Sequence, residues 1–262
     1  MKNDTVGTTD YIRFGHGSKN LILLPGLGDG LRTVRGTAGP MRLLYRSFIS
    51  NYTVYAFSRR NDILANATTR DMARDVKSCM DALGIEKADL WGVSMGGMIA
   101  QWMGVDYPEA IGKLVLTVTC AQPNPVITNA VTEWLGLAAA GDHTGLMDSN
   151  MRLIYSDAYY RKNKAYIPLV GAMMHPRSYD RFRILANACL THNCAAYLER
   201  IQSQTLVIGG QLDQVVGPDA ARELAAAIPG ATLRIYPEQG HGLYDESNDF
   251  QTTVLSFLQS EL

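Results

Sequence analysis

No apolar segment of the sequence approaches the roughly 18 residues that a membrane-spanning helix requires. The first residues, MKNDTVGTTDYIRF, also lack the apolar stretch of a secretory signal peptide. Internal repeats and low-complexity tracts are absent as well. These absences predict a cytoplasmic protein without a membrane partner, and the 47% hydrophobic and 19% charged residues are ordinary for a globular enzyme.

The sequence also lacks a large net charge of either sign, and it lacks the residue patterns that bind metal ions. The formal net charge is −1, which gives no reason to expect a nucleic-acid partner. The four cysteines form no CxxC pair and have no suitably spaced histidine, so we predict reduced, buried thiols and no metal site. Phosphate-binding glycine motifs are not found, and no cofactor is expected. The cysteines are Cys79, Cys120, Cys189 and Cys194.

What the sequence does contain is a series of short runs that are apolar on both faces, as is typical of buried parallel strands. A further strand is expected at 11–14. Helical patterns lie between the runs, such as the one after Thr68, with starts also expected at Pro218 and Ser247. This alternation predicts an α/β fold with a doubly wound, mostly parallel sheet. The expected buried strands are 20–24, 53–57, 88–93, 113–119, 205–209 and 232–236.

Residues 122–200 break the alternation, because they contain helix-like segments but no convincing strand. We therefore expect a core made of residues 1–121 and 201–262, and a helical cap, or lid, made of residues 122–200. A cap above the sheet edge would enclose an apolar or mixed pocket of small to medium size.

The stretch GVSMGG (92–97) stands between an apolar run and a helix-like segment. This is the strand–turn–helix context of the G-x-S-x-G nucleophile elbow. Side chains two residues before and after a serine on so sharp a turn would collide, and Gly92 and Gly96 remove those Cβ atoms. We therefore predict that Ser94 is the catalytic nucleophile, rather than part of a chance pattern.

A serine hydroxyl needs a base, and the base needs a partner that fixes its tautomer. His241, in EQGHGLY (238–244), follows the last predicted strand and should lie at the same sheet edge as Ser94, so it is the predicted base. His16 is expected in a surface turn. The cap contains the other three histidines, His143, His175 and His192.

The partner of the histidine should be a carboxylate at the same edge. Asp213 comes directly after the run at 205–209 and is the predicted third member of the triad. Asp219 is better explained as the first residue of a helix, and Glu238 lies in the histidine loop itself.

An oxyanion hole needs two N–H donors near the carbonyl group under attack. Met95, the residue after the nucleophile, is expected to supply one of them. The second is expected from Leu27 in LLPGLGDG (23–30), where glycines allow the backbone to approach the substrate closely. An ordinary glycine-rich turn is the alternative interpretation of this segment.

Together these segments resemble the α/β-hydrolase superfamily over nearly the whole chain. The resemblance also includes the chain order Ser, Asp, His, and it implies a helical cap inserted after the sixth strand. Within the superfamily, the segment after Ser94 is most similar to 3-oxoadipate enol-lactonases and related carboxylesterases. The segments that carry the resemblance are LLPGLGDG (23–30), GVSMGGMIAQWMGVDYPEAIGKLVLTVT (92–119), GGQLDQVV (209–216) and GHG (240–242).

Two positions depart from the pattern of many relatives. Pro25-Gly26 stands where they have His-Gly, so the backbone donor is kept but the hydrogen bonding of the loop must differ. The segment FSRRND (57–62) stands where they have Asp-x-Arg-Gly, with Arg59 at the arginine position and Arg60 in place of glycine. These departures weigh against borrowing a substrate from any one relative.

The combined prediction is a serine hydrolase that cleaves a small to medium carboxylic ester or lactone through an acyl-enzyme on Ser94. An acyltransferase with the same triad and a non-catalytic ligand-binding protein on this fold are the alternatives. A loop arginine could bind a substrate carboxylate. The candidate substrate-binding residues are Arg32, Arg35 and Arg59 near the active edge and Trp134 and Met174 in the cap.

Overall fold

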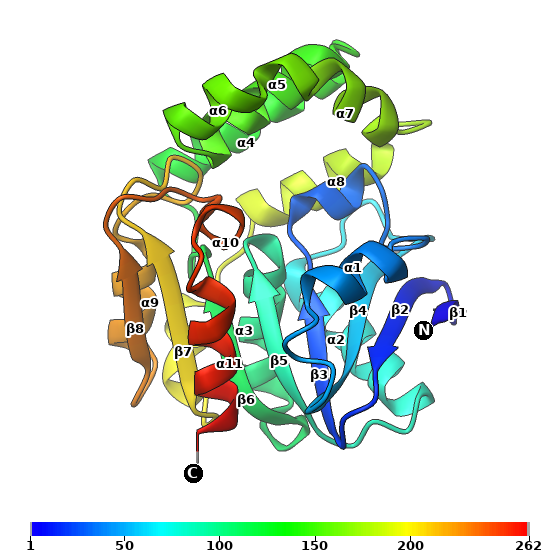
Figure 1. Cartoon of the computed structure of the whole chain (residues 1–262), viewed down its shortest axis with the longest axis vertical. Helices are drawn as coiled ribbons and strands as arrows, with labels where there is room; N and C mark the ends of the chain where they lie inside the picture. Colours follow the sequence, from blue (N-terminus) through cyan, green and yellow to red (C-terminus); the bar gives the residue numbers. More distant parts are fainter. Residues whose placement is uncertain (1, 261–262) are drawn as a thin grey trace.

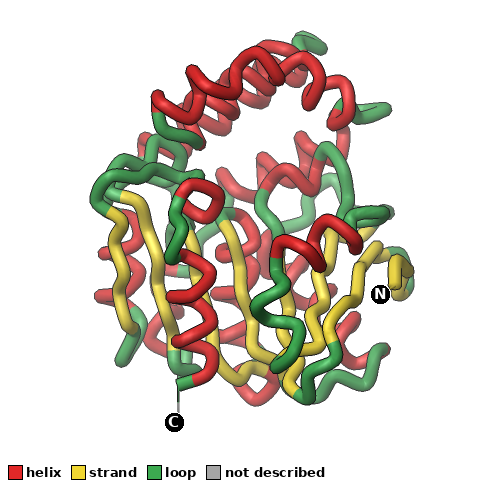
Figure 2. Tube along the Cα trace, in the orientation of Figure 1, coloured by secondary structure: helices red, strands yellow, loops and turns green. Residues whose placement is uncertain are grey.

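The computed structural model describes residues 2–260 and contains an eight-stranded sheet with the order β1-β2-β4-β3-β5-β6-β7-β8 (Figures 1 and 2). The hairpin β1–β2 pairs antiparallel to β4, and all other neighbours are parallel. Every strand predicted from the sequence is present. The strands are β1 (Lys2–Val6), β2 (Thr9–Gly15), β3 (Lys19–Leu24), β4 (Tyr52–Arg60), β5 (Ala88–Val93), β6 (Ile111–Thr117), β7 (Thr205–Gly210) and β8 (Thr232–Tyr236).

Both faces of the sheet are covered by helices, which explains why the inner strands are largely apolar. Along β3, for example, Leu21 and Leu23 belong to one buried cluster while Ile22 and Leu24 belong to the other. The sheet is therefore doubly wound, as predicted. One face carries α1 (Ala38–Leu44) and α11 (Phe250–Gln259), and the other carries α2 (Thr69–Ala82), α3 (Met95–Asp106) and α9 (Ala220–Ala227) (Figure 1).

The predicted helix starts are observed with one correction. Thr68 caps α2 in a capping box with Asp71, whose amide donates to the threonine hydroxyl oxygen at 3.1 Å. The helix α9 follows Pro218 and has Asp219 at its N-cap. Ser247 does not cap α11, because Asp249 occupies that position and the Ser247 hydroxyl donates to the side chain of Gln239.

The segment between β6 and β7 is helical, and it contains no strand among the residues that the structure describes. Figure 1 shows α4 to α7 as a layer above the carboxyl ends of the strands, with α8 between this layer and the sheet. Packing runs from α7 to α5, then α4, then α8, and α8 rests on η1 (Leu27–Gly30) of the core. The cap helices are α4 (Pro125–Ala139), α5 (His143–Ile154), α6 (Asp157–Asn163), α7 (Ile167–Met174) and α8 (Asp180–Leu190).

Two properties predicted from composition can be compared with the structure. Among residues 2–260, no helix combines the length and the apolar character needed to cross a bilayer. All four cysteines are free and buried, and burial raises the pKa of Cys189 and Cys194 to about 12. Burial therefore disfavours the thiolate form of these cysteines.

Candidate active site

Ser94 lies between β5 and α3 with φ 53° and ψ −120°, a backbone conformation that non-glycine residues rarely adopt. The flanking glycines make this turn possible. A Cβ on Gly96 would lie 1.9 Å from the Leu24 carbonyl oxygen, and a Cβ on Gly92 would lie 2.4 Å from the Gly96 carbonyl oxygen. Such a strained residue costs about 1–3 kcal/mol and persists because the packing around it permits no other path.

His241 lies beside Ser94 and is buried at the carboxyl edge of the sheet. Its Nε2 is 3.0 Å from the Ser94 Oγ, and its Nδ1 is 2.9 Å from the Asp213 Oδ2. A carboxylate at Nδ1 favours the tautomer with its proton there, which leaves the lone pair of Nε2 directed at the serine hydroxyl.

Asp213 is fixed by its own loop, which follows β7. Its Oδ1 accepts hydrogen bonds from the backbone amides of Val215 at 2.8 Å and Val216 at 2.9 Å. The second oxygen is thereby aimed at the imidazole. Three side chains far apart in sequence, at positions 94, 213 and 241, thus form one continuous hydrogen-bonded row.

The other residues considered for these roles lie elsewhere. His16 is exposed and pairs with the Ile49 carbonyl group. His192 is buried against Thr69 and Gln101, and Glu238 is exposed. The two remaining cap histidines, His143 and His175, contact each other with their rings tilted by 48° and their centroids 4.5 Å apart.

The two expected oxyanion donors both stand at the first position of a helix. Leu27 begins η1 and Met95 begins α3. Among residues 2–260, neither amide donates to a protein acceptor. A Cβ on Gly26 would lie 3.3 Å from the Ser94 Cβ, so the first loop runs directly against the serine. The position of both amides suits stabilisation of negative charge.

Arg59 does not line the cavity that contains Ser94. It is buried, and its guanidinium group donates to the carbonyl oxygens of Pro25 and Phe57. Burial lowers the pKa of Arg59, while the nearby Asp29 carboxylate opposes that shift. The arginine therefore supports the loop of Leu27 at Pro25, and its side chain does not reach the cavity.

Arg181, on the cap helix α8, was not singled out in the sequence. Its Nη2 donates to the Asp29 Oδ2 at 2.7 Å and to the Arg59 carbonyl oxygen at 2.9 Å, and its Nε donates to the Asp29 carbonyl oxygen at 3.1 Å. The Asp29 side chain has no exposed surface. A Cβ on Gly30 would lie 2.8 Å from the Phe182 Cα, so α8 and η1 are in close contact. The cap thereby clamps the loop that presents the Leu27 amide.

A second attachment joins the cap to the loop that carries His241. The Gly242 amide donates to the Ile154 carbonyl oxygen at 2.6 Å, and the Tyr155 hydroxyl donates to the Asp245 Oδ2 at 2.7 Å. The residues at the end of α5 therefore help to position the turn between β8 and α10 (Leu243–Glu246).

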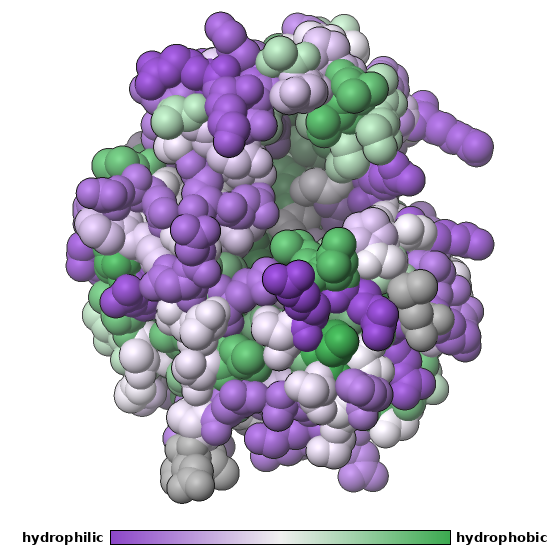
Figure 3. Space-filling model, viewed as in Figure 1, coloured by the Kyte–Doolittle hydropathy of each residue, from purple (hydrophilic) through white to green (hydrophobic). Residues whose placement is uncertain are grey.

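A cavity of about 430 Å³ opens above Ser94 between the cap and the core, and Figure 3 shows a hollow at this level. Its walls are predominantly apolar. Of the predicted substrate-binding residues, Arg32, Trp134 and Met174 line the cavity. Arg35 is exposed and lies outside the lining, as does the buried Arg59. The apolar lining includes Val34, Met41, Leu44, Trp134, Ile154 and Met174.

Comparison with known proteins gives consistent results. The family model described as "Serine aminopeptidase, S33" matches residues 64–248. A 2-hydroxy-6-oxononadienedioate/2-hydroxy-6-oxononatrienedioate hydrolase 2 of Pseudomonas putida is 26% identical over 262 residues, which cover 95% of this chain and 91% of the relative.

Two solved structures share the whole architecture. MGS-M2, an alpha/beta hydrolase enzyme from a Medee basin deep-sea metagenome library, has a TM-score of 0.85 and 21% identity, covering 100% of this chain and 98% of its own. The enol-lactonase from Burkholderia xenovorans LB400 has a TM-score of 0.82 and 20% identity, covering 99% of this chain and all of its own.

The matched segment, residues 64–248, contains Ser94, Asp213 and His241 as well as the entire cap. The chain therefore belongs to the serine hydrolases of the α/β-hydrolase superfamily, in the family described as "Serine aminopeptidase, S33".

Proposed function

We propose that this hydrolase cleaves a small to medium carboxylic ester or lactone, and that Ser94 forms the acyl-enzyme. The single observation that carries the proposal is the row of hydrogen bonds from Ser94 Oγ to His241 Nε2, at 3.0 Å, and from His241 Nδ1 to Asp213 Oδ2, at 2.9 Å. These distances are within the range that proton transfer to a general base requires.

In the first half of the proposed reaction, Ser94 Oγ attacks the carbonyl carbon while His241 Nε2 takes the hydroxyl proton. The carbonyl oxygen becomes an oxyanion that accepts hydrogen bonds from the Leu27 and Met95 amides. One such donor contributes about 3–4 kcal/mol to transition-state stabilisation. His241 then gives its proton to the leaving alkoxide, the bond to the leaving group breaks, and the acyl group stays on Ser94.

In the second half, water enters from the open side of the cavity. His241 Nε2 takes a proton from this water as its oxygen attacks the acyl carbon, and the proton then passes to Ser94 Oγ as the acid is released. Asp213 stabilises the imidazolium ion in both halves. General base catalysis of this kind contributes about 10²–10⁴-fold.

The cavity supports an apolar or weakly polar acyl group. A volume of about 430 Å³ lies toward the lower part of the range of known ligand pockets and suits a small to medium substrate. The cap supplies Trp134, Ile154 and Met174 to the lining, and α1 supplies Met41 and Leu44.

The Pseudomonas putida relative suggests a second candidate reaction. Its named substrate is a hydroxy-oxo dicarboxylate with no ester bond, so a hydrolase acting on it must break a carbon–carbon bond. Two substrate carboxylates would need cationic partners, but Arg32 is the one lysine or arginine that lines the cavity in the described part of the chain. Asp245 also lines it, and Asp29 borders it with a side chain that is buried and paired with Arg181. This charge balance favours the ester or lactone.

The test compares wild type with Ser94→Ala on short p-nitrophenyl esters, five- and six-membered lactones and the hydroxy-oxo dicarboxylate. We expect turnover of esters or lactones, a loss of about 10⁴-fold or more in kcat/KM in Ser94→Ala, and labelling of wild type alone by a fluorophosphonate. Turnover of the dicarboxylate in preference to every ester and lactone would select the second candidate. Equal labelling of both proteins would exclude Ser94 as the nucleophile.

A further inference from the structure

The helix α7 has two apolar faces, and one of them is exposed. Ile167 and Gly171 are buried in the cap. The exposed apolar side chains stand at the spacing i, i+3, i+4 and i+7, which places them in a stripe along the opposite face. Leu169 and Met173 are each 64% exposed. The stripe consists of Tyr166, Leu169, Val170 and Met173.

A second exposed apolar pair lies on α1, across the mouth of the cavity. Leu43 is 68% exposed and Leu44 is 49% exposed. The two sites are close, since Leu44 and Met174 line the same cavity and the Arg32 Nη1 donates to the Met173 carbonyl oxygen at 3.2 Å. Figure 3 shows hydrophobic atoms at the positions of α1 and α7 on either side of the hollow. We call these six exposed apolar side chains the mouth surface.

The chain segments that carry the mouth surface are basic and contain no carboxylate. Neither residues 30–58 nor residues 158–179 contain an aspartate or glutamate. Together they hold eight of the 24 lysines and arginines, all exposed, so that the rest of the chain carries a net charge of −9. Within residues 2–260, none of the eight forms a salt bridge. They are Arg32, Arg35, Arg42, Arg46, Arg161, Lys162, Lys164 and Arg177.

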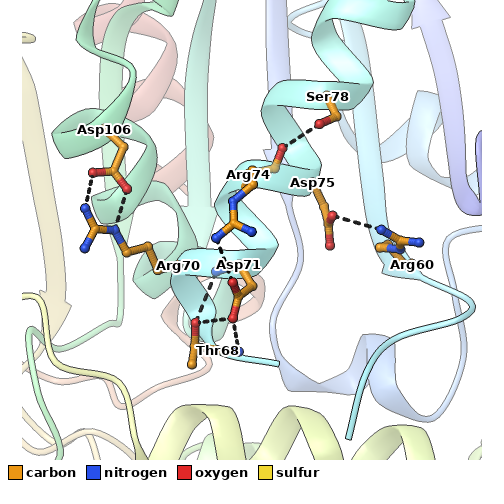
Figure 4. A network of polar contacts seen from close by, with 8 residues as sticks. All are labelled: Arg60, Thr68, Arg70, Asp71, Arg74, Asp75, Ser78 and Asp106. Carbon is orange, nitrogen blue, oxygen red and sulfur yellow. Dashed lines mark hydrogen bonds and ion pairs between the residues drawn. The ribbon is translucent and has the colours of Figure 1, made fainter. Parts of the chain in front are cut away.

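The cations on and near α2 differ in this respect. Figure 4 shows Arg60, Arg70 and Arg74 beside carboxylates. Arg70 forms a bidentate pair with Asp106 at 2.7 Å for both bonds, and Lys77 pairs with Asp81 at 2.6 Å. Within residues 2–260, eight of the 16 lysines and arginines outside the two segments form salt bridges, whereas none of the eight inside them does. The two segments are therefore richer than the rest of the chain in cations without a carboxylate partner.

We propose that the mouth surface docks on an anionic lipid surface, with the stripe of α7 and the pair on α1 inserted among the acyl chains. Exposed apolar side chains on chain segments rich in cations are the combination that interfacial helices use. Headgroup phosphates supply the negative charge that the eight cations lack within the chain. A second copy of this chain is a poorer occupant, because two surfaces of the same charge would repel.

Docking in this orientation places the cavity mouth against the lipid, so that an apolar ester partitioned there enters without crossing water. This consequence rests on the proposed function, whereas the docking itself does not. Binding to vesicles and turnover of a water-soluble ester are separate measurements, and failure of one leaves the other standing.

The experiment is co-sedimentation of the intact protein with vesicles of phosphatidylcholine alone and of phosphatidylcholine with phosphatidylglycerol. We expect binding to the anionic vesicles that weakens as salt is raised. Leu169→Glu should lower the partition coefficient of the protein between vesicles and water at least about tenfold. The double variant Lys162→Gln/Lys164→Gln should lower the same partition coefficient about fivefold for each cation removed. Turnover of a short water-soluble ester should be unchanged in these variants, because these residues do not line the cavity.

Matched controls lie away from the mouth. Leu233, on β8 at the far edge of the sheet, is also exposed, so Leu233→Glu should leave vesicle binding unchanged. Arg74→Gln with Lys77→Gln removes the same charge from ion-paired positions on α2 and should have a smaller effect. Equal binding to neutral vesicles, no binding to either kind, or a dimer in solution that Leu169→Glu dissociates would each overturn the proposal.

Discussion

The floor of the cavity, which is the sheet edge with Ser94, Asp213 and His241, and its roof, which is the cap helices α4 to α8, are held in place in different ways. In the floor, Asp213 and His241 are buried and have fixed partners, since Asp213 accepts two backbone amides and contacts His241. In the roof, α7 packs on α5 and exposes Leu169 and Met173 to solvent. The cap contacts the floor through α8 and through the end of α5.

This difference separates two tasks. The floor holds reacting atoms to within a few tenths of an ångström, which requires buried hydrogen bonds whose alternatives are costly. The roof lies over those atoms, and in the docking proposed above its exposed apolar surface contacts lipid. Substitutions in the floor should therefore affect chemistry, stability or both, and substitutions at exposed positions should affect neither strongly.

The largest expected effect in the floor comes from Asp213→Asn. An amide at this position would favour the tautomer that puts the proton on His241 Nε2, so that the base could no longer accept the serine proton. We expect kcat to fall about 10⁴-fold with little change in the thermal midpoint. Steady-state kinetics and calorimetry on the same preparation measure both. If Asp213→Asn has the same kcat as wild type, Asp213 has no role in the reaction.

The next effect concerns the contact between roof and floor. Arg181→Gln removes the cation beside the buried Asp29 carboxylate, and breaking a buried pair of this kind costs about 3–5 kcal/mol. Because the same arginine clamps the loop of Leu27, we also expect kcat to fall about tenfold or more with a smaller change in KM.

Two comparisons distinguish positioning from simple stability. Arg181→Lys should recover part of the stability but less of kcat, since lysine cannot make the same set of fixed hydrogen bonds. Arg152→Gln, which removes an exposed cap arginine, should leave kcat unchanged. If kcat of folded Arg181→Gln equals that of wild type, the arginine does not position the loop.

A pH effect is expected where the cap joins the core. His192 is buried between α8 and η4 (Ala195–Arg200), against Thr69 and Gln101, and burial lowers its pKa to about 3. The unfolded chain, with a histidine pKa of about 6.5, binds a proton first. Stability is therefore full above about pH 6.5 and is lost as pH falls toward 3, by about 3 kcal/mol between pH 7 and pH 4.

Urea unfolding at pH 7, 5.5 and 4 tests this expectation. His192→Gln should be less stable than wild type at pH 7 and should show a shallower loss of stability on acidification. His16→Gln, at an exposed histidine, should keep the wild-type slope. If the slopes of His192→Gln and wild type coincide, then His192 is not the group responsible.

The smallest expected effect lies on the ion-paired surface of α2. Asp106→Asn breaks the bidentate pair with Arg70, whose side chain is 46% exposed. Exposed pairs contribute about 1 kcal/mol or less, so the free energy of unfolding should change by no more than that, and kcat should not change. If Asp106→Asn lowers the free energy of unfolding as much as Arg181→Gln does, then exposed and buried ion pairs do not differ in their contribution to stability.

The sequence alone predicted the sheet well because its strands are buried on both faces and therefore produce short, wholly apolar runs. The edge strands differ: the polar residues KNDTV of β1 are mostly exposed and give no such run, and β8 is exposed over residues 232–234. The convergence of Ser94, Asp213 and His241 could be anticipated because each follows a strand, and the carboxyl ends of parallel strands meet at one edge. The assignment of roles to them is the proposal made above.

Contacts between distant side chains could not be read from local patterns. Nothing in the sequence around Arg181 indicates that it reaches Asp29, which is 152 positions away. Arg59 looks like a loop residue in sequence but is buried beneath Pro25. The net charge of −1 likewise conceals eight cations without salt bridges on two segments, so the overall charge does not predict the lipid surface that we propose.

The central claim is that the acyl group resides on Ser94 during turnover. Rapid acid quenching of the enzyme with a p-nitrophenyl ester, followed by intact mass spectrometry and peptide mapping, measures this directly. We predict one acyl group per chain on the peptide that contains Ser94, and none in Ser94→Ala. Sustained turnover by wild type with no adduct, or with the adduct on another residue, would contradict the account.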